Sequence, residues 1–373
     1  MENNIFFDKL QSDIFLNRNI FSDVIKKIKK FEKVIIWGTG VAGTMIHKSL
    51  RKNGVEIYAF SDSNSFQNGY TEKEGCKVIS CFDIPKEACV VIAANYDYGI
   101  HDFLNGKEIK NWIYIDPFYL SAYSDVYVDK ISKIYSDNSE KIKDVYSSLS
   151  DSKSRETFKA VLLHRAVHKI DTLWNYWERK QYFGNDVIKN VSGNFVDCGA
   201  YNGDTLRDFI DQVHGKEYLY YAFEPETDNY STLRKYAEET DPERIKTYKL
   251  GIWDKKTKLC FVCDDEGGGE TGRMVENENN EEVESVSVDS VDNILNGDRA
   301  DFIKMDIEGA EIKALSGCCK TVGLWHPTMA ISSYHELEHL WEVPIKILTL
   351  SEEYKLYYRH HSWNWVDTVC YGL

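Results

Sequence analysis

Apolar runs of strand length alternate with helical patterns over the first third of the chain. Residues 1–30 and 41–53 have apolar positions at helical spacing. The strand-length runs cover residues 34–37, 55–60, 88–93 and 111–116. Apolar strands separated by helices are typical of a parallel sheet, because helices cover both of its faces.

The same alternation begins again at residue 194. The apolar runs there cover residues 195–198, 217–224, 244–253, 301–308 and 327–333. Two final runs, 354–361 and 365–373, are separated by a short polar turn and predict an antiparallel pair. Residues 258–263 and 283–288 predict an antiparallel insertion. We therefore expect a second doubly wound sheet that ends in a β-hairpin.

The segment between these two stretches lacks a strand pattern. Residues 118–190 contain apolar positions at helical spacing, most clearly over 154–180. The predicted fold class is α/β, with two doubly wound, Rossmann-like parallel-sheet domains joined by a helical bridge. The predicted parts are residues 1–117, the bridge 118–190, and residues 191–373.

Composition and charge disfavour some classes of function. The 373 residues carry a formal net charge of −15, which disfavours a protein that binds the nucleic-acid backbone through general positive charge. The nine cysteines include a single C-x-x-C pair, Cys260 and Cys263, and no second pair that would complete a zinc site; the remaining spacings predict no disulfide framework. We find no signal peptide pattern and no apolar run of the ~18 residues that span a bilayer. These features predict a cytoplasmic protein.

The stretch FVDCGAYNGDT, residues 195–205, has the pattern of a cofactor loop between a strand and a helix. Glycine lets the backbone approach a ligand, and ligands of α/β sheets bind at the carboxyl ends of strands. Asp197 and Asp204 beside the loop would repel a diphosphate and attract an ammonium group. This charge argument favours S-adenosylmethionine (SAM) over NAD at this loop.

The next strand ends in a second acidic residue. Glu224 follows Asp197 by 27 residues and stands where a carboxylate can accept hydrogen bonds from both hydroxyls of a ribose. NAD and SAM both contain a ribose, so Glu224 does not distinguish them. The alternative for Glu224 is a surface charge after a strand.

With these motifs, the chain resembles the FkbM family of SAM-dependent methyltransferases over about residues 180–373. The motifs that carry the resemblance are FVDCGAYNGDT (195–205), AFEPE (222–226), LGIWD (250–254), DFIKMDIEGAE (301–311), SSYHELEHLWEVP (332–344) and RHHSWNWVDTVCYG (359–372). The resemblance implies a seven-stranded class I methyltransferase sheet and methyl transfer to oxygen, often on sugars or natural products.

The resemblance also implies a cofactor site. The methionine end of SAM would be held by Asp197, Gly199, Ala200, Tyr201, Asn202, Gly203, Asp204 and Thr205. The ribose would be bound by Glu224, and the adenine would lie near Gly251, Ile252 and Trp253, where an aromatic ring can stack.

Ionisable residues at the end of the run 301–308 predict the reacting end of the site. In an extended strand, Lys304, Asp306 and Glu308 point to one face, whereas a central parallel strand is normally apolar on both. These residues therefore mark the mouth of a site; the alternative is a salt-bridged strand end.

A hydroxyl acceptor must lose a proton when it is methylated. His335, expected at the start of a helix, is the best candidate for the base, ahead of His360 and His361 on the terminal hairpin. Asp306, Glu308 and His335 could also hold a metal ion that acidifies the hydroxyl, but no spacing in the sequence requires one. The metal stays unassigned.

The first domain contains its own glycine loop. Gly38, Gly40 and Gly43 follow a strand and open a helix, and Asp62 comes just after the next strand, which is the dinucleotide fingerprint in its usual context. The sequence leaves open whether this loop binds NAD, a nucleotide-sugar or no ligand.

We therefore predict a SAM-dependent O-methyltransferase that acts on a sugar or a polysaccharide precursor, with a small-molecule or glycan acceptor. One alternative is an NAD-dependent nucleotide-sugar enzyme centred on the first loop. Another is a scaffold that binds SAM without transferring its methyl group. The sequence also leaves open a homo-oligomer.

Overall fold

The computed structural model describes residues 2–18, 20–62, 71–93, 98–115, 125–168, 172–213, 216–263, 272–275 and 285–373. The chain forms two compact units. Unit 1 contains residues 1–138 and 162–175, and unit 2 contains residues 139–161 and 176–373. The helices predicted to form a bridge are thus divided between the units, and the predicted domain boundaries stay a prediction.

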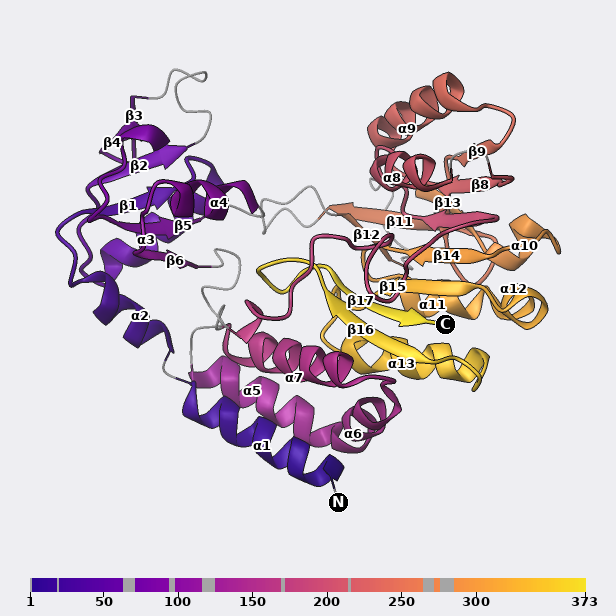
Figure 1. Ribbon diagram of the computed structural model, residues 1–373, viewed down its shortest axis with the longest axis horizontal. Helices are drawn as coiled ribbons and strands as arrows, with labels where there is room; N and C mark the ends of the chain where they lie inside the picture. The colour runs from indigo at the N-terminus through magenta and orange to yellow at the C-terminus, as the bar shows by residue number, and fades with distance from the viewer. Residues whose placement is uncertain are drawn as a thin grey trace. The chain divides into compact units, whose positions relative to one another are not determined.

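Unit 1 is built on a six-stranded sheet, drawn in indigo and purple in Figure 1. Its strands are β1 (Val34–Trp37), β2 (Ala59–Asp62), β3 (Glu72–Lys73), β4 (Cys76–Ser80), β5 (Cys89–Ile92) and β6 (Trp112–Tyr114). They lie in the order β3-β4-β2-β1-β5-β6, and every pair except β3 with β4 is parallel. The carboxyl end of β1 therefore lies where the strand order reverses, beside β5.

Five helices of the described chain belong to unit 1. They are α1 (Glu2–Leu16), α2 (Ile20–Ile28), α3 (Val41–Lys52), α4 (Tyr98–Gly106) and α5 (Asp125–Asp137). Ile46 and Leu50 of α3 pack with Ile36, Phe60 and Val91 of the sheet in one buried cluster. The apolar runs correctly predicted β1, β5 and β6, whereas the run 55–60 overlaps β2 only at Ala59 and Phe60. The pattern missed β4, because its sequence CKVIS is partly exposed and Lys77 interrupts its apolar positions.

Unit 2 contains a seven-stranded sheet. Its strands are β7 (Phe195–Cys198), β8 (Tyr220–Phe223), β9 (Ile245–Tyr248), β14 (Phe302–Met305), β15 (Thr328–Ser332), β16 (Leu356–His360) and β17 (Thr368–Gly372). The order is β16-β17-β15-β14-β7-β8-β9, with β17 antiparallel to both of its neighbours and the remaining pairs parallel. This confirms the predicted doubly wound sheet with a terminal hairpin. The order reverses between β7 and β14, so ligands are expected at their carboxyl ends.

Helices and a small second sheet complete unit 2. The helices are α6 (Ser139–Ser148), the first part of α7 (Ser152–Val167), α8 (Asp204–Gln212), α9 (Thr227–Thr240), α10 (Val291–Leu295), α11 (Glu311–Ser316), α12 (Cys319–Trp325) and α13 (His339–Leu350). The second sheet contains β10 (Gly251–Ile252), β11 (Thr257–Cys263), β12 (Gly272–Val275) and β13 (Ser285–Asp289), with β11 antiparallel to both β12 and β13. In Figure 1, α8 and α9 lie near β8, and α13 lies beside the terminal hairpin.

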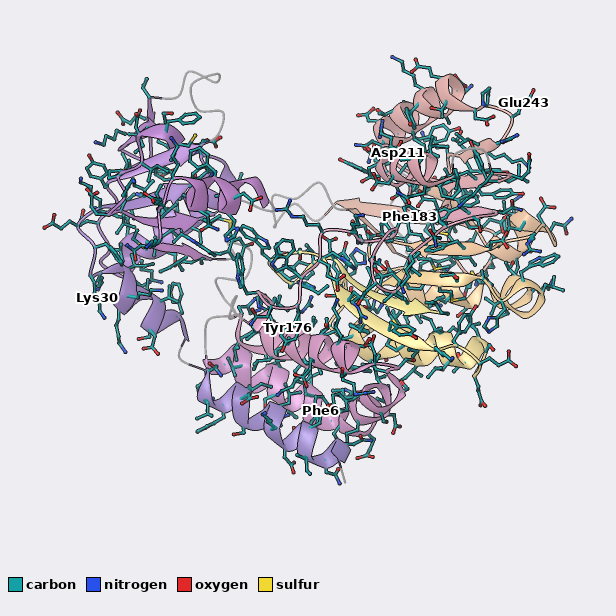
Figure 2. All side chains as sticks on the ribbon, in the orientation of Figure 1. Phe6, Lys30, Tyr176, Phe183, Asp211 and Glu243 are labelled. Atoms are coloured by element: carbon teal, nitrogen blue, oxygen red, sulfur yellow. The ribbon has the colours of Figure 1, made fainter. Side chains whose placement is uncertain are left out.

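Aromatic side chains form the core below the carboxyl ends of β7 and β14. The Phe183 ring, labelled in Figure 2, lies 5.5 Å from that of Phe195 and 6.0 Å from that of Phe302. The Phe195 and Phe302 rings stack at 4.8 Å between the two central strands. This packing fixes the strands whose ends carry the candidate site.

Two predicted elements have different bounds in the structure. The run 301–308 is a strand only to Met305, because the chain leaves the sheet at Asp306. The helix expected over 154–180 ends at Val167, and residues 172–180 contain turns and bends.

Candidate active site

A buried ion pair joins β7 to β14. The Asp197 carboxylate is fully buried, and it accepts hydrogen bonds from Lys304 Nζ at 2.9 Å and from the Tyr220 hydroxyl at 2.5 Å. Burial opposes the charge of Lys304, but the facing Asp197 raises the pKa of this amine to about 12. Lys304 also donates to the carbonyl oxygen of Gly199 at 2.7 Å. The pair therefore fixes the start of the loop that follows β7.

The loop after β7 needs its first glycine. Gly199 has φ +84°, and a Cβ there would lie 1.9 Å from the carbonyl oxygen of Asp306. Any side chain at this position would collide with the backbone that leaves β14. The loop then runs through Gly203, at φ +86°, into the first turn of α8. The two strand ends are thus in direct backbone contact.

Glu224 fixes the same loop from the other side. It is buried just after β8, and its two carboxylate oxygens accept hydrogen bonds from the backbone N–H groups of Tyr201 and Glu226, each at 2.9 Å. Burial raises the pKa of this carboxyl. Each carboxylate oxygen can accept a further hydrogen bond, so a ribose could bind here.

The residues predicted near the adenine lie in the second sheet of unit 2. Gly251 and Ile252 form β10, which pairs with β13. Trp253 follows them, is 6% exposed, and its indole Nε1 is buried without a hydrogen-bond partner in the described chain. The ammonium of Lys313 lies 5.7 Å from the centre of the Trp253 ring.

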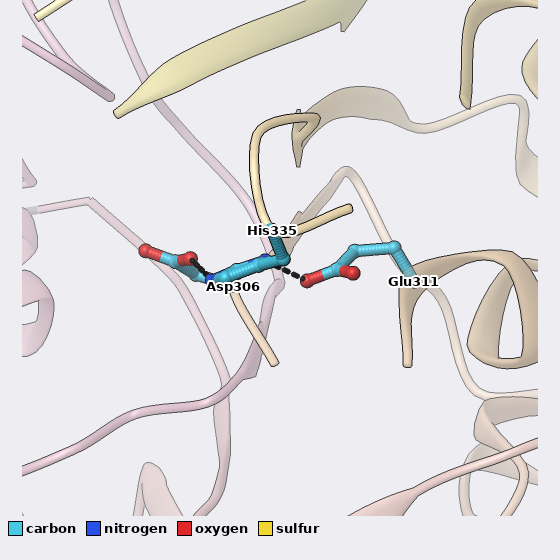
Figure 3. A group of neighbouring side chains, drawn as sticks. All are labelled: Asp306, Glu311 and His335. Atoms are coloured by element: carbon cyan, nitrogen blue, oxygen red, sulfur yellow. Dashed lines mark ion pairs between the residues drawn. The ribbon is translucent and has the colours of Figure 1, made fainter. Parts of the chain in front are cut away.

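A second charged cluster lies beyond the end of β14. Figure 3 shows His335 between Asp306 and Glu311. His335 Nδ1 lies 2.9 Å from Glu311 Oε1, whereas Nε2 lies 3.5 Å from Asp306 Oδ1 and 3.4 Å from Glu308 Oε2. Donor atoms of Asp306, Glu311 and His335 all lie within 4.8 Å of one another, close enough for a metal-binding group.

The environment of His335 favours its charged form. Its side chain is 7% exposed, and burial alone would lower its pKa. The nearby carboxylates, above all Glu311, outweigh burial and raise the pKa of His335 to about 10. Glu311 is fully buried, and its Oε1 accepts a hydrogen bond from the backbone N–H of Ile307 at 2.9 Å.

The structure separates the predicted catalytic residues into two groups. Asp306, Glu308 and His335 lie together in loops, and His335 precedes α13 instead of starting a helix. Glu308 has φ +54°, so the prediction that it lies in an extended strand is wrong. Lys304 remains in β14, where it is 3% exposed and paired with Asp197.

His360 and His361, the weaker base candidates, are buried in the terminal hairpin. His360 Nδ1 lies 2.8 Å from Thr368 Oγ1, and His361 Nε2 lies 2.8 Å from the Tyr371 hydroxyl. Burial lowers the pKa of His361 to about 4. These contacts give both residues a role in packing the hairpin.

A pocket of about 380 Å³ lies along α8. It is lined by Arg179, Lys180, Gln181, Tyr182, Phe183, Asp204, Thr205, Asp208, Asp211 and Gln212. The Tyr182 hydroxyl donates to Asp306 at 3.2 Å, which connects the pocket wall to the charged cluster. The lining is mostly polar and contains charges of both signs.

The glycine loop of unit 1 is held in a similar way. The Asp62 carboxylate, at the end of β2, accepts hydrogen bonds from Thr39 N at 3.2 Å and Thr39 Oγ1 at 2.8 Å. Gly38 has φ +125°, and a Cβ on Gly43 would lie 1.9 Å from the Gly38 carbonyl oxygen. As with Glu224, a carboxylate at the end of the second strand holds the loop backbone.

Residues 197–355 match the model of the methyltransferase FkbM domain. This part of the chain is an FkbM methyltransferase domain. A crystal structure of methyltransferase FkbM from Methylobacillus flagellatus KT is similar to the chain, with a TM-score of 0.67 and 21% identity over 100% of this chain and 99% of that chain. The protein is a methyltransferase, as the sequence predicted.

More distant structures give weaker matches. Fibrillarin from Aeropyrum pernix, solved with natively bound SAM, has a TM-score of 0.31 and 8% identity, with 49% of this chain and 67% of that chain covered. No curated protein sequence matches the chain. Among the helices that the structure describes, none has the length and apolar character needed to cross a membrane.

The sequence analysis missed several residues around the FkbM site. They are Tyr182, Tyr220, Glu311, Tyr334 and His339. The three tyrosines have the sequence pattern of core residues, and only the fold directs their hydroxyls to Asp197 and Asp306. Glu311 stands in the IEGAE motif, and a carboxylate in the first turn of a helix is also common for capping alone.

Proposed function

We propose that the protein transfers the methyl group of SAM to a hydroxyl group of a sugar or glycoconjugate precursor. The observation that carries this proposal is the doubly anchored loop 199–203. Lys304 holds the Gly199 carbonyl, and Glu224 holds the Tyr201 N–H. Such a rigid loop at the switch point of the sheet is suited to a cofactor, because its geometry needs no rearrangement on binding.

The proposed cofactor site uses the predicted residues in two ways. Asp197 and Lys304 act indirectly, because their charges are buried and satisfied by each other. Residues 199–205 and Glu224 would contact SAM, with Glu224 accepting from the ribose hydroxyls. The adenine would lie near Gly251, Ile252 and Trp253. SAM itself supplies the electrophilic methyl group.

The proposed reacting end is the cluster of Asp306, Glu308 and His335. It lies at the end of β14, next to the Gly199 turn that contacts the Asp306 backbone. Carboxylates and an imidazole there can orient an acceptor hydroxyl and receive its proton. His335 serves as the base only in its neutral form, and the adjacent carboxylates disfavour that form.

A polar acceptor is supported by the pocket beside α8. Its volume of about 380 Å³ is in the range of small-molecule sites, and aspartates and basic residues line it. Hydroxyl-rich ligands suit such a lining, because they both donate and accept hydrogen bonds. Tyr182 of the pocket wall donates its hydroxyl to Asp306, so the pocket and the cluster are neighbours.

The first test is cofactor binding followed by transfer. Isothermal calorimetry should give binding of one SAM per chain. Incubation with methyl-labelled SAM and a panel of nucleotide-sugars, free sugars and amino sugars should give one product that is 14 mass units heavier per transfer. Absence of SAM binding would refute the proposal. SAM binding with transfer to a non-sugar hydroxyl compound would refute only the acceptor class.

Unit 1 has a separate proposed role. Its glycine loop, held by Asp62, is built to approach a nucleotide, and we propose NAD or a nucleotide-sugar as its ligand. Calorimetry with each compound tests this role. Failure of both to bind would leave unit 1 without a nucleotide function and leave the methyltransferase proposal unaffected.

A further inference from the structure

At the reacting end, one imidazole nitrogen lies close to two carboxylate oxygens. His335 Nε2 lies 3.5 Å from Asp306 Oδ1 and 3.4 Å from Glu308 Oε2. Both distances exceed the usual length of a hydrogen bond. Two ligands at right angles on one ion, with bonds of about 2.1 Å, are separated by roughly 3 Å. A small shift of each carboxylate toward Nε2 would therefore bring its oxygen to the spacing of two ligands on one cation.

The imidazole gives an independent indication of a ligand. The His335 side chain is 7% exposed, and its Nε2, at 3.4 Å from Glu308 and 3.5 Å from Asp306, makes no hydrogen bond in the described chain. Leaving a buried polar atom without a partner costs about 1–3 kcal/mol. Nε2 is directed toward Asp306 and Glu308, so a cation between them would satisfy it.

The surroundings match those of metal sites. A histidine that binds a metal usually directs its other ring nitrogen to a carboxylate, and His335 Nδ1 lies 2.9 Å from buried Glu311. Ligating carboxylates are themselves hydrogen-bonded: Asp306 accepts from the hydroxyls of Tyr182 at 3.2 Å and Tyr334 at 3.1 Å. These partners fix the ring and the carboxylate in place.

We propose that Asp306, Glu308 and His335 bind one divalent cation of the Mg²⁺ or Mn²⁺ type. The mixed donor set favours Mn²⁺, because carboxylates suit Mg²⁺ and Mn²⁺, whereas imidazole suits transition metals. The cation occupies the side of His335 that faces Asp306 and Glu308, and Glu311 holds the opposite side of the ring. The cation takes the place of the proton on Nε2, which is released to solvent, so His335 is then a neutral ligand and no longer the base.

The cation has a defined use, which rests on the proposed function. A divalent ion bound to an acceptor hydroxyl lowers its pKa and orients its oxygen. Asp306, Glu308 and His335 would hold the ion, and one or two hydroxyls of the acceptor could bind it in place of water. A sugar with neighbouring hydroxyls suits such a site.

The experiment measures metal binding without any substrate. The full chain is treated with EDTA, exchanged into metal-free buffer and titrated with MnCl₂, with free Mn²⁺ followed by electron paramagnetic resonance. We expect one Mn²⁺ site per chain. Glu308→Gln should weaken it at least ~10-fold, because one of three protein ligands is lost. Glu308 is exposed, so this variant should fold.

Matched variants separate the possible outcomes. Glu353→Gln, an exposed carboxylate outside the cluster, should bind Mn²⁺ like the wild type. Glu311→Gln should weaken Mn²⁺ ~10- to 100-fold if it orients His335. Equal Mn²⁺ binding by the wild type and Glu308→Gln, or none by the wild type, would overturn the metal site. SAM affinity, measured on the same samples, reports separately on the proposed function.

Discussion

At the residue scale, the site depends on charges that never face solvent. Asp197 and Lys304 neutralise each other inside the sheet, and together they fix the loop that begins at Gly199. Glu224 fixes the same loop through Tyr201 while keeping acceptor capacity for a ligand. Asp197 therefore acts on the loop through Lys304, whereas Glu224 both holds the loop and remains available to bind a ligand.

Glu224→Ala should weaken SAM binding at least ~10-fold. A hydrogen bond to a charged group contributes about 1.5–3 kcal/mol, and ~1.4 kcal/mol is a factor of ten in affinity. Calorimetry measures the affinity, and thermal unfolding checks that the variant is folded. Glu217→Ala, an exposed carboxylate before the same strand, is the control. Unchanged SAM affinity in folded Glu224→Ala would remove the ribose assignment.

Lys304→Met should destabilise the protein by about 3–5 kcal/mol, because it leaves the Asp197 charge buried without its partner. The double variant Asp197→Asn with Lys304→Met should recover a large part of this loss. Urea denaturation of the two single variants and the double variant gives the coupling free energy. Additive effects would show that the two charges do not act as a pair.

At the element scale, loops and strands of unit 2 are joined by a buried guanidinium. Arg359 of β16 is 1% exposed and makes ion pairs with Asp151, just before α7, and with Asp186, in the segment before β7. One side chain therefore fixes the terminal hairpin to both segments. The Glu311 carboxylate does the same on a smaller scale, joining α11 to His335.

Stability should fall as the pH is lowered through the titration of Asp151. Burial alone would raise the pKa of this carboxyl, but Arg359 and Ser154 lower it to about 2. The stabilisation is present above the unfolded-state pKa of about 3.9 and is lost as the pH falls toward about 2. Urea denaturation at a series of pH values measures this loss.

Asp151→Asn is the control for the acid titration. It should be less stable than the wild type at neutral pH, and its stability should change less between about pH 4 and pH 2, because the titrating group is absent. Parallel pH curves for the two proteins would mean that the Asp151 pair does not stabilise the fold.

At the scale of the whole molecule, the chain has two glycine loops in two compact units. In each, a carboxylate at the end of the second strand accepts a hydrogen bond from the loop backbone: Asp62 from Thr39, and Glu224 from Tyr201. Only the second unit contains the charged cluster at the end of β14. The two loops are therefore held in the same way, but this similarity does not show that they have the same function.

Gly40→Val should leave SAM affinity unchanged within about twofold. A Cβ at Gly40 meets nothing within 4 Å, so the variant should fold, and the side chain would block only a ligand of its own loop. Calorimetry with SAM tests the first point, and calorimetry with NAD and nucleotide-sugars tests the second. A large loss of SAM affinity in a folded variant would show that the cofactors are assigned to the wrong loops.

The sequence determined the α/β class, most strands of the two large sheets and the positions of the two glycine loops. Strands buried on both faces give continuous apolar runs, and a loop with Gly199 and Gly203 needs positive φ that glycine adopts readily. Residues that act through local backbone geometry can thus be recognised in the sequence. The terminal hairpin was predicted for the same reason.

Only the tertiary structure decided which charges meet. Lys304 and Asp306 are two residues apart, yet one pairs inside the sheet with Asp197 and the other leaves the strand to face His335. Tyr182 and Tyr334 reach Asp306 over separations of 124 and 28 residues. Because such contacts depend on where strands end and loops turn, and not on spacing along the chain, periodicity carries no signal for them.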